Sequence, residues 1–89
     1  GLGDVYKRQR YAEAEGLFRQ AYEILGSSGP LTNRARLYFL WKADHELVRR
    51  TLDEAPVAMR SDRYWSVRGY ILQMIGDLTG ALAAFSIPS

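Results

Sequence analysis

The 89-residue sequence contains no cysteine and only one histidine, His45. The absence of cysteine excludes a disulfide framework and any thiolate metal site, but it leaves the cellular compartment open. Long apolar runs are also missing: the longest, Leu37–Trp41, is far shorter than the ~20 residues that a membrane helix needs. The formal net charge of +2 is too small to indicate a nucleic acid as the partner.

What the sequence does contain is a helical period of apolar residues. From residue 11 they recur at spacings of three and four, which predicts one face of a helix: Tyr11, Ala14, Phe18, Ala21, Tyr22 and Leu25. The segment 26–30, rich in glycine and ending in Pro30, is expected to stop this helix. Further helices are predicted at 31–42, at 44–55 with Asp44 as N-cap, from Ser61 or Asp62 to Ile75, and at 78–86. Asp77 aligns with Asp44 at a separation of 33 and is predicted to cap the last of these helices.

The predicted helices repeat along the chain. Ala14, Val48 and Ala81 superpose at separations of 34 and 33, and Phe18, Leu52 and Phe85 superpose in the same way. The preceding helices also match at a separation of 34, which pairs Leu31 with Trp65, Arg34 with Arg68, Ala35 with Gly69, and Tyr38 with Leu72. A unit of two helices repeated every ~34 residues predicts an array of stacked helix pairs.

The segment Trp65-x-x-Arg68-Gly69-x-x-Leu72, followed by Gly76-Asp77 and Ala81-x-x-x-Phe85, resembles a tetratricopeptide repeat. Arg34 and Arg68 stand where that family usually has Leu, and Leu72 stands for Tyr. The middle unit carries Val48 and Leu52 for Ala and Phe, so the resemblance is to a divergent member. It implies an all-α fold of antiparallel helix–turn–helix repeats stacked as an α-solenoid, about two and a half repeats long.

The two ends of the chain are treated separately. Residues 4–9 resemble one reading frame of the transposon end used to prepare sequencing libraries, so residues 1–9 are expected to be a non-native segment. The alternative is a genuine helix start. Residues 10–89 are then expected to form a partial repeat domain: 10–26 as the second helix of repeat 1, 31–56 as repeat 2 and 61–89 as a truncated repeat 3. Neighbouring repeats are expected to be missing.

No catalytic or ligand-binding constellation is found, so no enzyme, metal or cofactor is predicted. His45 has no cysteine or second histidine to join it. The carboxylates of Glu13 with Glu15, and of Asp53 with Glu54, lie one or two residues apart and point in different directions on a helix. The glycines from Gly76 to Gly80 lack the Lys-Ser/Thr of a phosphate loop.

The resemblance implies a protein or peptide partner, held in a concave groove lined by the first helix of each repeat. Helical spacing then assigns eight side chains to the groove: Thr32, Arg36, Phe39, Leu40, Arg63, Ser66, Tyr70 and Gln73. Arginine and aromatic residues are enriched at binding hot spots. Two alternatives remain open: a helical regulatory region of a larger enzyme or transcription regulator, and an RNA-binding helical array.

The RNA alternative depends on whether the arginines form one basic strip. Its candidates are Arg34, Arg36, Arg49, Arg50, Arg60, Arg63 and Arg68. Interspersed acidic residues and the small net charge disfavour it. Arg34 and Arg68 are expected near the interface within each repeat, where Asp44 and Asp77 are candidate ion-pair partners.

Overall fold

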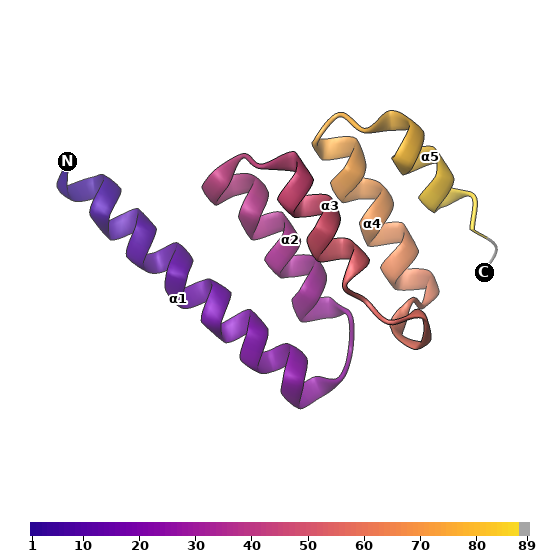
Figure 1. Ribbon diagram of the computed structural model, residues 1–89, viewed down its shortest axis with the longest axis horizontal. Helices are drawn as coiled ribbons and strands as arrows, with labels where there is room; N and C mark the ends of the chain where they lie inside the picture. The colour runs from indigo at the N-terminus through magenta and orange to yellow at the C-terminus, as the bar shows by residue number, and fades with distance from the viewer. Residues whose placement is uncertain (88–89) are drawn as a thin grey trace.

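The computed structural model describes residues 1–87 and is all-helical, with no strand in that range (Figure 1). The α-helices are α1 (Leu2–Leu25), α2 (Gly29–Lys42), α3 (His45–Asp53), α4 (Asp62–Met74) and α5 (Leu78–Phe85). A short 3-10 helix, η1 (Val57–Met59), precedes α4. The predicted all-α fold class is therefore confirmed. None of these helices combines the length and the apolar character needed to cross a membrane.

The helix starts follow local capping chemistry. The Asp44 carboxylate accepts a hydrogen bond from the Leu47 backbone N–H at 3.0 Å, at the start of α3. Ser61 accepts one from the Tyr64 N–H at 3.3 Å, at the start of α4. Asp77 accepts one from the Gly80 N–H at 2.9 Å, at the start of α5. Each bond satisfies a backbone donor that has no partner inside its helix, so the caps predicted at Asp44 and Asp77 are confirmed.

The residue just before two of these caps has a left-handed backbone. Gly76 has φ +83° before Asp77, and Ala43 has φ +49° before Asp44. Gly26, which ends α1, has φ +62°. Glycine adopts this conformation without steric cost, whereas Ala43 adopts it against the preference of its Cβ. The turn from α2 to α3 is therefore strained where the turn from α4 to α5 is not.

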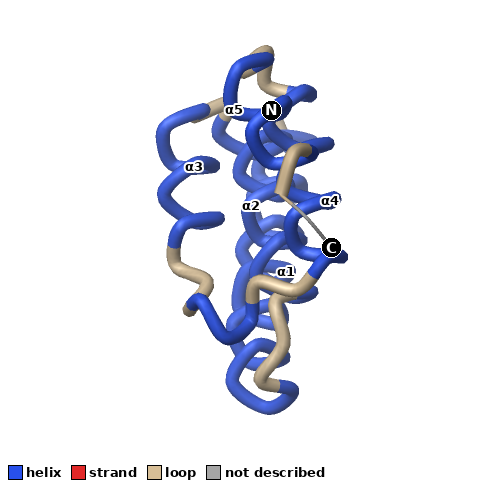
Figure 2. Tube along the Cα trace, turned by 90° about the vertical axis from the view of Figure 1, so that its right-hand side faces the viewer, coloured by secondary structure: helices blue, strands red, loops and turns tan. Residues whose placement is uncertain are grey.

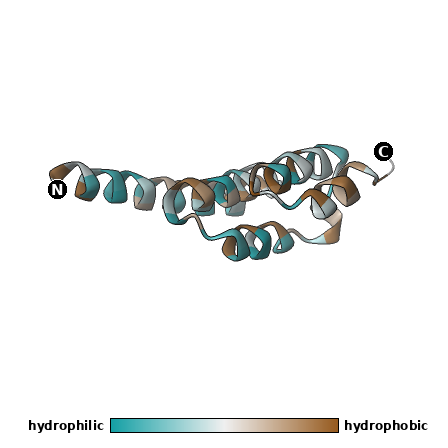
Figure 3. Cartoon of the chain, turned by 90° about the horizontal axis from the view of Figure 1, so that it is seen from above, coloured by the Kyte–Doolittle hydropathy of each residue, from teal (hydrophilic) through white to brown (hydrophobic). Residues whose placement is uncertain are grey.

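Consecutive helices run in alternating directions across a thin molecule with Cα extents of 47 × 31 × 15 Å (Figure 1). α2 contacts α1 on one flank and α4 on the other. α3 lies outside the layer that holds α1, α2 and α4, and it packs on one side of that layer (Figures 2 and 3). α1 and α5 lie at opposite ends of the long axis.

The core is formed where α3 and α5 meet α2 and α4. Its main cluster combines residues from four helices: Ala35, Tyr38, Val48, Leu52, Ile71, Leu72, Ile75 and Ala81. A second cluster joins Leu31 of α2, Ala55 after α3 and Tyr64 of α4, with Tyr22 and Trp65 packed against it. Leu52 and Val48 are completely buried. These burials supply the main stabilisation of a chain this small.

Residues 1–9 do not contribute to that core. They continue α1 back to Leu2 as a helix, and every one of them is exposed. α1 contacts α2 through later residues; the rings of Tyr11 and Trp41, for example, stack with centroids 5.9 Å apart.

Candidate functional site

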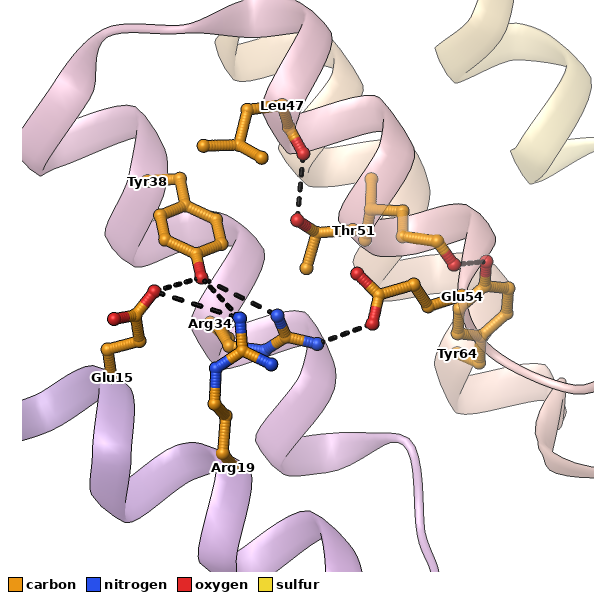
Figure 4. Close-up of polar contacts among 9 residues, drawn as sticks. Glu15, Arg19, Arg34, Tyr38, Leu47, Thr51, Glu54 and Tyr64 are labelled. Carbon is orange, nitrogen blue, oxygen red and sulfur yellow. Dashed lines mark hydrogen bonds and ion pairs between the residues drawn. The ribbon is translucent and has the colours of Figure 1, made fainter.

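A buried arginine joins three parts of the chain. The Arg34 side chain is 5% exposed and donates to the Glu54 carboxylate at 2.8 Å and to the Tyr38 hydroxyl at 3.5 Å. The Tyr38 hydroxyl donates to Glu15 of α1 (Figure 4). Burial lowers the pKa of the Arg34 guanidinium, but the bonds to Tyr38 and Glu54 outweigh it and raise the pKa above its ordinary value. The charge is therefore fixed, and it ties α1, α2 and the end of α3 together.

Arg68 of α4 also combines a carboxylate of the α3 end with a tyrosine of its own helix, here four residues before it rather than four after. Its guanidinium donates to Asp53 at 2.8 Å and to the Tyr64 hydroxyl at 2.9 Å, and that hydroxyl donates to the Leu52 carbonyl at 2.7 Å. Burial lowers the pKa of Arg68, but the bonds to Asp53 and Tyr64 raise it overall. Both arginines thus reach the C-terminal end of α3, where cations also interact favourably with the helix dipole.

The predicted ion-pair partners of these arginines are wrong. Asp44 caps α3, and Asp77 caps α5 and accepts from Arg49 at 3.1 Å. Arg34 lies near the start of α2. Because α3 runs antiparallel to α2, the C-terminal end of α3 lies beside the start of α2, so Glu54 contacts Arg34, whereas Asp44 lies at the far end of α2.

The seven arginines do not form one free basic strip. Arg34, Arg49 and Arg68 are in ion pairs. Arg60 donates to the carbonyls of Ala55 and Asp53, at 2.9 and 3.2 Å. The exposed members of the set are Arg36, Arg50 and Arg63.

Six of the eight predicted groove residues are exposed on α2 and α4. Leu40 is 62% exposed and Tyr70 is 64% exposed. Because α1, α3 and α4 cover the other sides of α2, the exposed side of α2 faces away from α3. Met74, which is 41% exposed, extends this surface and was not predicted. We call the surface the open face and define it by Arg36, Leu40, Arg63, Ser66, Tyr70, Gln73 and Met74.

The structure does not place Thr32 and Phe39 on the open face. Thr32 is buried, and its hydroxyl donates to the Gly29 carbonyl at 2.9 Å. Phe39 is half-buried against the main core cluster, and its ring stacks on His45 with centroids 6.0 Å apart. Because α1, α3 and α4 pack around α2, a smaller part of its surface is exposed to solvent than helical spacing suggested.

A cleft of about 320 Å³ lies between α1 and α2 and was not predicted. It is lined mainly by apolar side chains, from Tyr11, Ala14 and Phe18 of α1 and from Asn33, Arg36, Leu37 and Leu40 of α2. Arg36 and Leu40 belong to the open face as well, so the cleft opens onto that face. The sequence carried a sign of this cleft in the helical spacing of Tyr11, Ala14 and Phe18. We interpreted that spacing only as a helix face that packs inside the fold.

The described residues offer no centre for metal chemistry. Within residues 1–87, no group of three or more His, Asp or Glu side chains is placed to hold a metal ion. His45 is exposed at the start of α3. The buried polar groups of this region are paired with one another, as in the contacts of Arg34 and Arg68 described above.

Residues 1–87 thus form an all-helical array with the open face on α2 and α4 and an apolar cleft between α1 and α2. Searches for similarity find no matching protein-family model and no significant match among curated proteins or solved structures.

Proposed function

We propose that this chain is part of a tetratricopeptide-like solenoid and serves as a protein-interaction module. Its open face binds a peptide or a helix of a partner. Support for the repeat comes from residues 34 and 33 apart. Ala35 and Leu52 lie in one core cluster, and Gly69 packs directly against Phe85 in the next helix pair. Ala43 and Gly76 take the same left-handed turn before equivalent aspartate caps.

The observation that carries the binding proposal is the composition of the open face. Leu40, Tyr70 and Met74 stay exposed on α2 and α4, and Arg36 and Arg63 are exposed on the same two helices. The Tyr70 ring also packs edge-to-face against Phe85 of α5, with centroids 5.2 Å apart. Tyr and Arg supply most hot spots of protein interfaces, since they combine apolar area with directional hydrogen bonding. Exposed apolar side chains beside cationic ones favour a partner that is a helix or an extended peptide and carries apolar and acidic residues.

Peptides selected from a random display library against the immobilised chain test this proposal. Binding of the selected peptides should weaken at least about tenfold on Arg63→Ala and on Tyr70→Ala. Arg50→Ala and Tyr6→Ala are matched controls, because both residues are exposed but lie on α3 and α1. If the controls weaken binding as much as the open-face variants do, the open face is not the binding surface.

The two alternatives are separated by different measurements. A regulatory region of a larger enzyme or regulator would use the same open face against another domain of its own chain, which the flanking reading frame identifies. The RNA-binding alternative is less supported, because Arg34, Arg49, Arg60 and Arg68 are engaged inside the molecule. Measurable RNA affinity at low salt that falls steeply as salt is added would favour it instead.

A further inference from the structure

Tyr70 of the open face is in contact with a second aromatic ring. Its ring and that of Phe85 pack edge-to-face, with the ring planes at 72°, which is an arrangement that aromatic pairs prefer. Tyr70 belongs to α4 and Phe85 is the last residue of α5, and these two helices lie side by side (Figure 1). The contact therefore ties an exposed residue of the open face to a helix that contributes none of the residues that define this face.

The ring of Phe85 is in turn seated on the backbone of α4. A methyl group added to Gly69 would lie 2.5, 2.7 and 2.8 Å from three carbons of that ring, distances at which the ring would have to move. Gly69 is buried, whereas Tyr70, the next residue along the chain, is 64% exposed. Two consecutive residues of α4 thus contact the same Phe85 ring, one from inside the fold and one at its surface.

Contact with a seated ring limits the rotamers that are open to Tyr70. An exposed side chain exchanges between several staggered rotamers, and binding has to order it at a cost in conformational entropy. Ordering one such side chain lowers affinity by about two- to tenfold, and a surface that is ordered before it binds avoids that loss. Tyr70 is the aromatic residue of the open face and the expected anchor for a partner, so its order matters most there.

We infer that Phe85 is a positioning residue for partner binding: it holds the Tyr70 ring in the orientation in which the open face binds a partner, and Gly69 gives Phe85 the space to do so. This inference rests on the proposed interaction function and deepens it, because it names the residues that set the anchor of the open face. Phe85 acts through Tyr70, and Gly69 acts through Phe85. Each substitution should therefore affect binding only while the residue through which it acts is present.

The first measurement needs no partner. Scalar couplings between the Hα and Hβ protons of Tyr70, measured by nuclear magnetic resonance on the full chain, report how many χ1 rotamers the side chain visits. The wild-type couplings should correspond to one rotamer. Phe85→Leu keeps an apolar side chain but removes the ring, so the couplings should move toward the average over several rotamers.

The second measurement uses the display-selected peptides whose binding Tyr70→Ala weakens. Phe85→Leu should weaken these peptides by about two- to tenfold. In a Tyr70→Ala background the same substitution should change their affinity by less than about twofold, because no ring remains to be positioned. Urea unfolding in parallel checks that every variant is folded under the conditions of the titration.

Gly69→Ala adds a variant at a residue that is buried and cannot touch the peptide. Its methyl group displaces the Phe85 ring, so binding should weaken by about twofold or more, but not in a Phe85→Leu background. Gly16→Ala is the matched control, since it makes the same change inside α1 with nothing within 4 Å of the added methyl group, and it should leave affinity unchanged. If Gly69→Ala does not fold, the Phe85→Leu comparisons decide alone.

Rotamer-averaged couplings of Tyr70 in the wild type would overturn the inference. So would unchanged peptide affinity in Phe85→Leu, or equal weakening by Phe85→Leu with and without Tyr70, which would mean that Phe85 contacts the partner directly. Failure of the proposed function looks different. In that case Tyr70→Ala leaves the affinity of the selected peptides unchanged, while the couplings still show one rotamer of Tyr70.

Discussion

A methyl group placed on Gly69 would lie 2.5 Å from the nearest ring carbon of Phe85, so α4 and α5 approach as closely as glycine allows. In the preceding helix pair the equivalent residues are Ala35 and Leu52, which are both completely buried. One pair thus combines glycine with a large ring, and the other combines alanine with a smaller side chain. The two solutions keep similar total volume at the helix crossing, which is what a close-packed contact requires.

This relationship predicts coupling between the two positions. Gly69→Ala gains about 1 kcal/mol of helix propensity, but it forces the Phe85 ring out of place. In a Phe85→Leu background the ring is absent, so Gly69→Ala should be more stabilising there than in the wild type. A double-mutant cycle by urea unfolding should give a coupling free energy of about 0.5–2 kcal/mol.

Gly16→Ala is the matched control for that cycle. Gly16 lies inside α1, and nothing lies within 4 Å of an added methyl group. Gly16→Ala should stabilise the chain by about 1 kcal/mol whether residue 85 is Phe or Leu. Additive effects of Gly69→Ala and Phe85→Leu would show that the close contact is absent in solution.

The two helix turns predict opposite effects of exchanging glycine and alanine. Ala43 holds φ +49°, so Ala43→Gly should raise the free energy of unfolding by about 0.5–1 kcal/mol. Gly76 holds φ +83°, and an added Cβ there would touch nothing within 4 Å, so the cost of Gly76→Ala comes from the backbone alone. Gly76→Ala should lower stability by about 1 kcal/mol. Urea unfolding of both variants checks the signs, and a stabilising Gly76→Ala would contradict this account.

Local chemistry explains which features were predictable from the sequence. Asp44 and Asp77 were predicted as caps because an N-cap depends only on the next few residues. The partners of Arg34 and Arg68 were not predictable in this way, because Glu54 and Asp53 reach them only through antiparallel packing. Thr32 was misplaced for a related reason: spacing gives the direction of a side chain, and the neighbouring helices decide how wide the exposed arc is.

The hydroxyl of Tyr64 gives a prediction about buried polar groups. Tyr64 is 1% exposed, and its hydroxyl donates to the Leu52 carbonyl and accepts from Arg68. Tyr64→Phe removes both of these hydrogen bonds and leaves the Leu52 carbonyl only the Ala55 N–H at 3.3 Å, so the free energy of unfolding should fall by about 1–3 kcal/mol. Tyr70→Phe is the control. Tyr70 is 64% exposed, and its hydroxyl has no partner among residues 1–87, so stability should change by less than about 0.5 kcal/mol. Equal effects of the two substitutions would remove the role assigned to the Tyr64 hydroxyl.

Asp77 gives a prediction about acid. The Gly80 N–H and then the Arg49 guanidinium lower the pKa of the Asp77 carboxyl below its ordinary value of 3.8. The folded state therefore binds fewer protons at this group than the unfolded state does, so stability from Asp77 is present above that value and is lost as the pH falls through the lower, folded-state pKa. Asp77→Asn keeps a side-chain oxygen for the cap but cannot titrate. The variant should lose less stability than the wild type when urea unfolding is repeated at increasingly acidic pH.

Glu23→Gln is the control for this prediction. Glu23 is an exposed residue of α1 without an ion pair in residues 1–87, so this variant should show the same dependence of stability on pH as the wild type. A wild-type slope in Asp77→Asn would mean that other carboxyl groups account for the acid response.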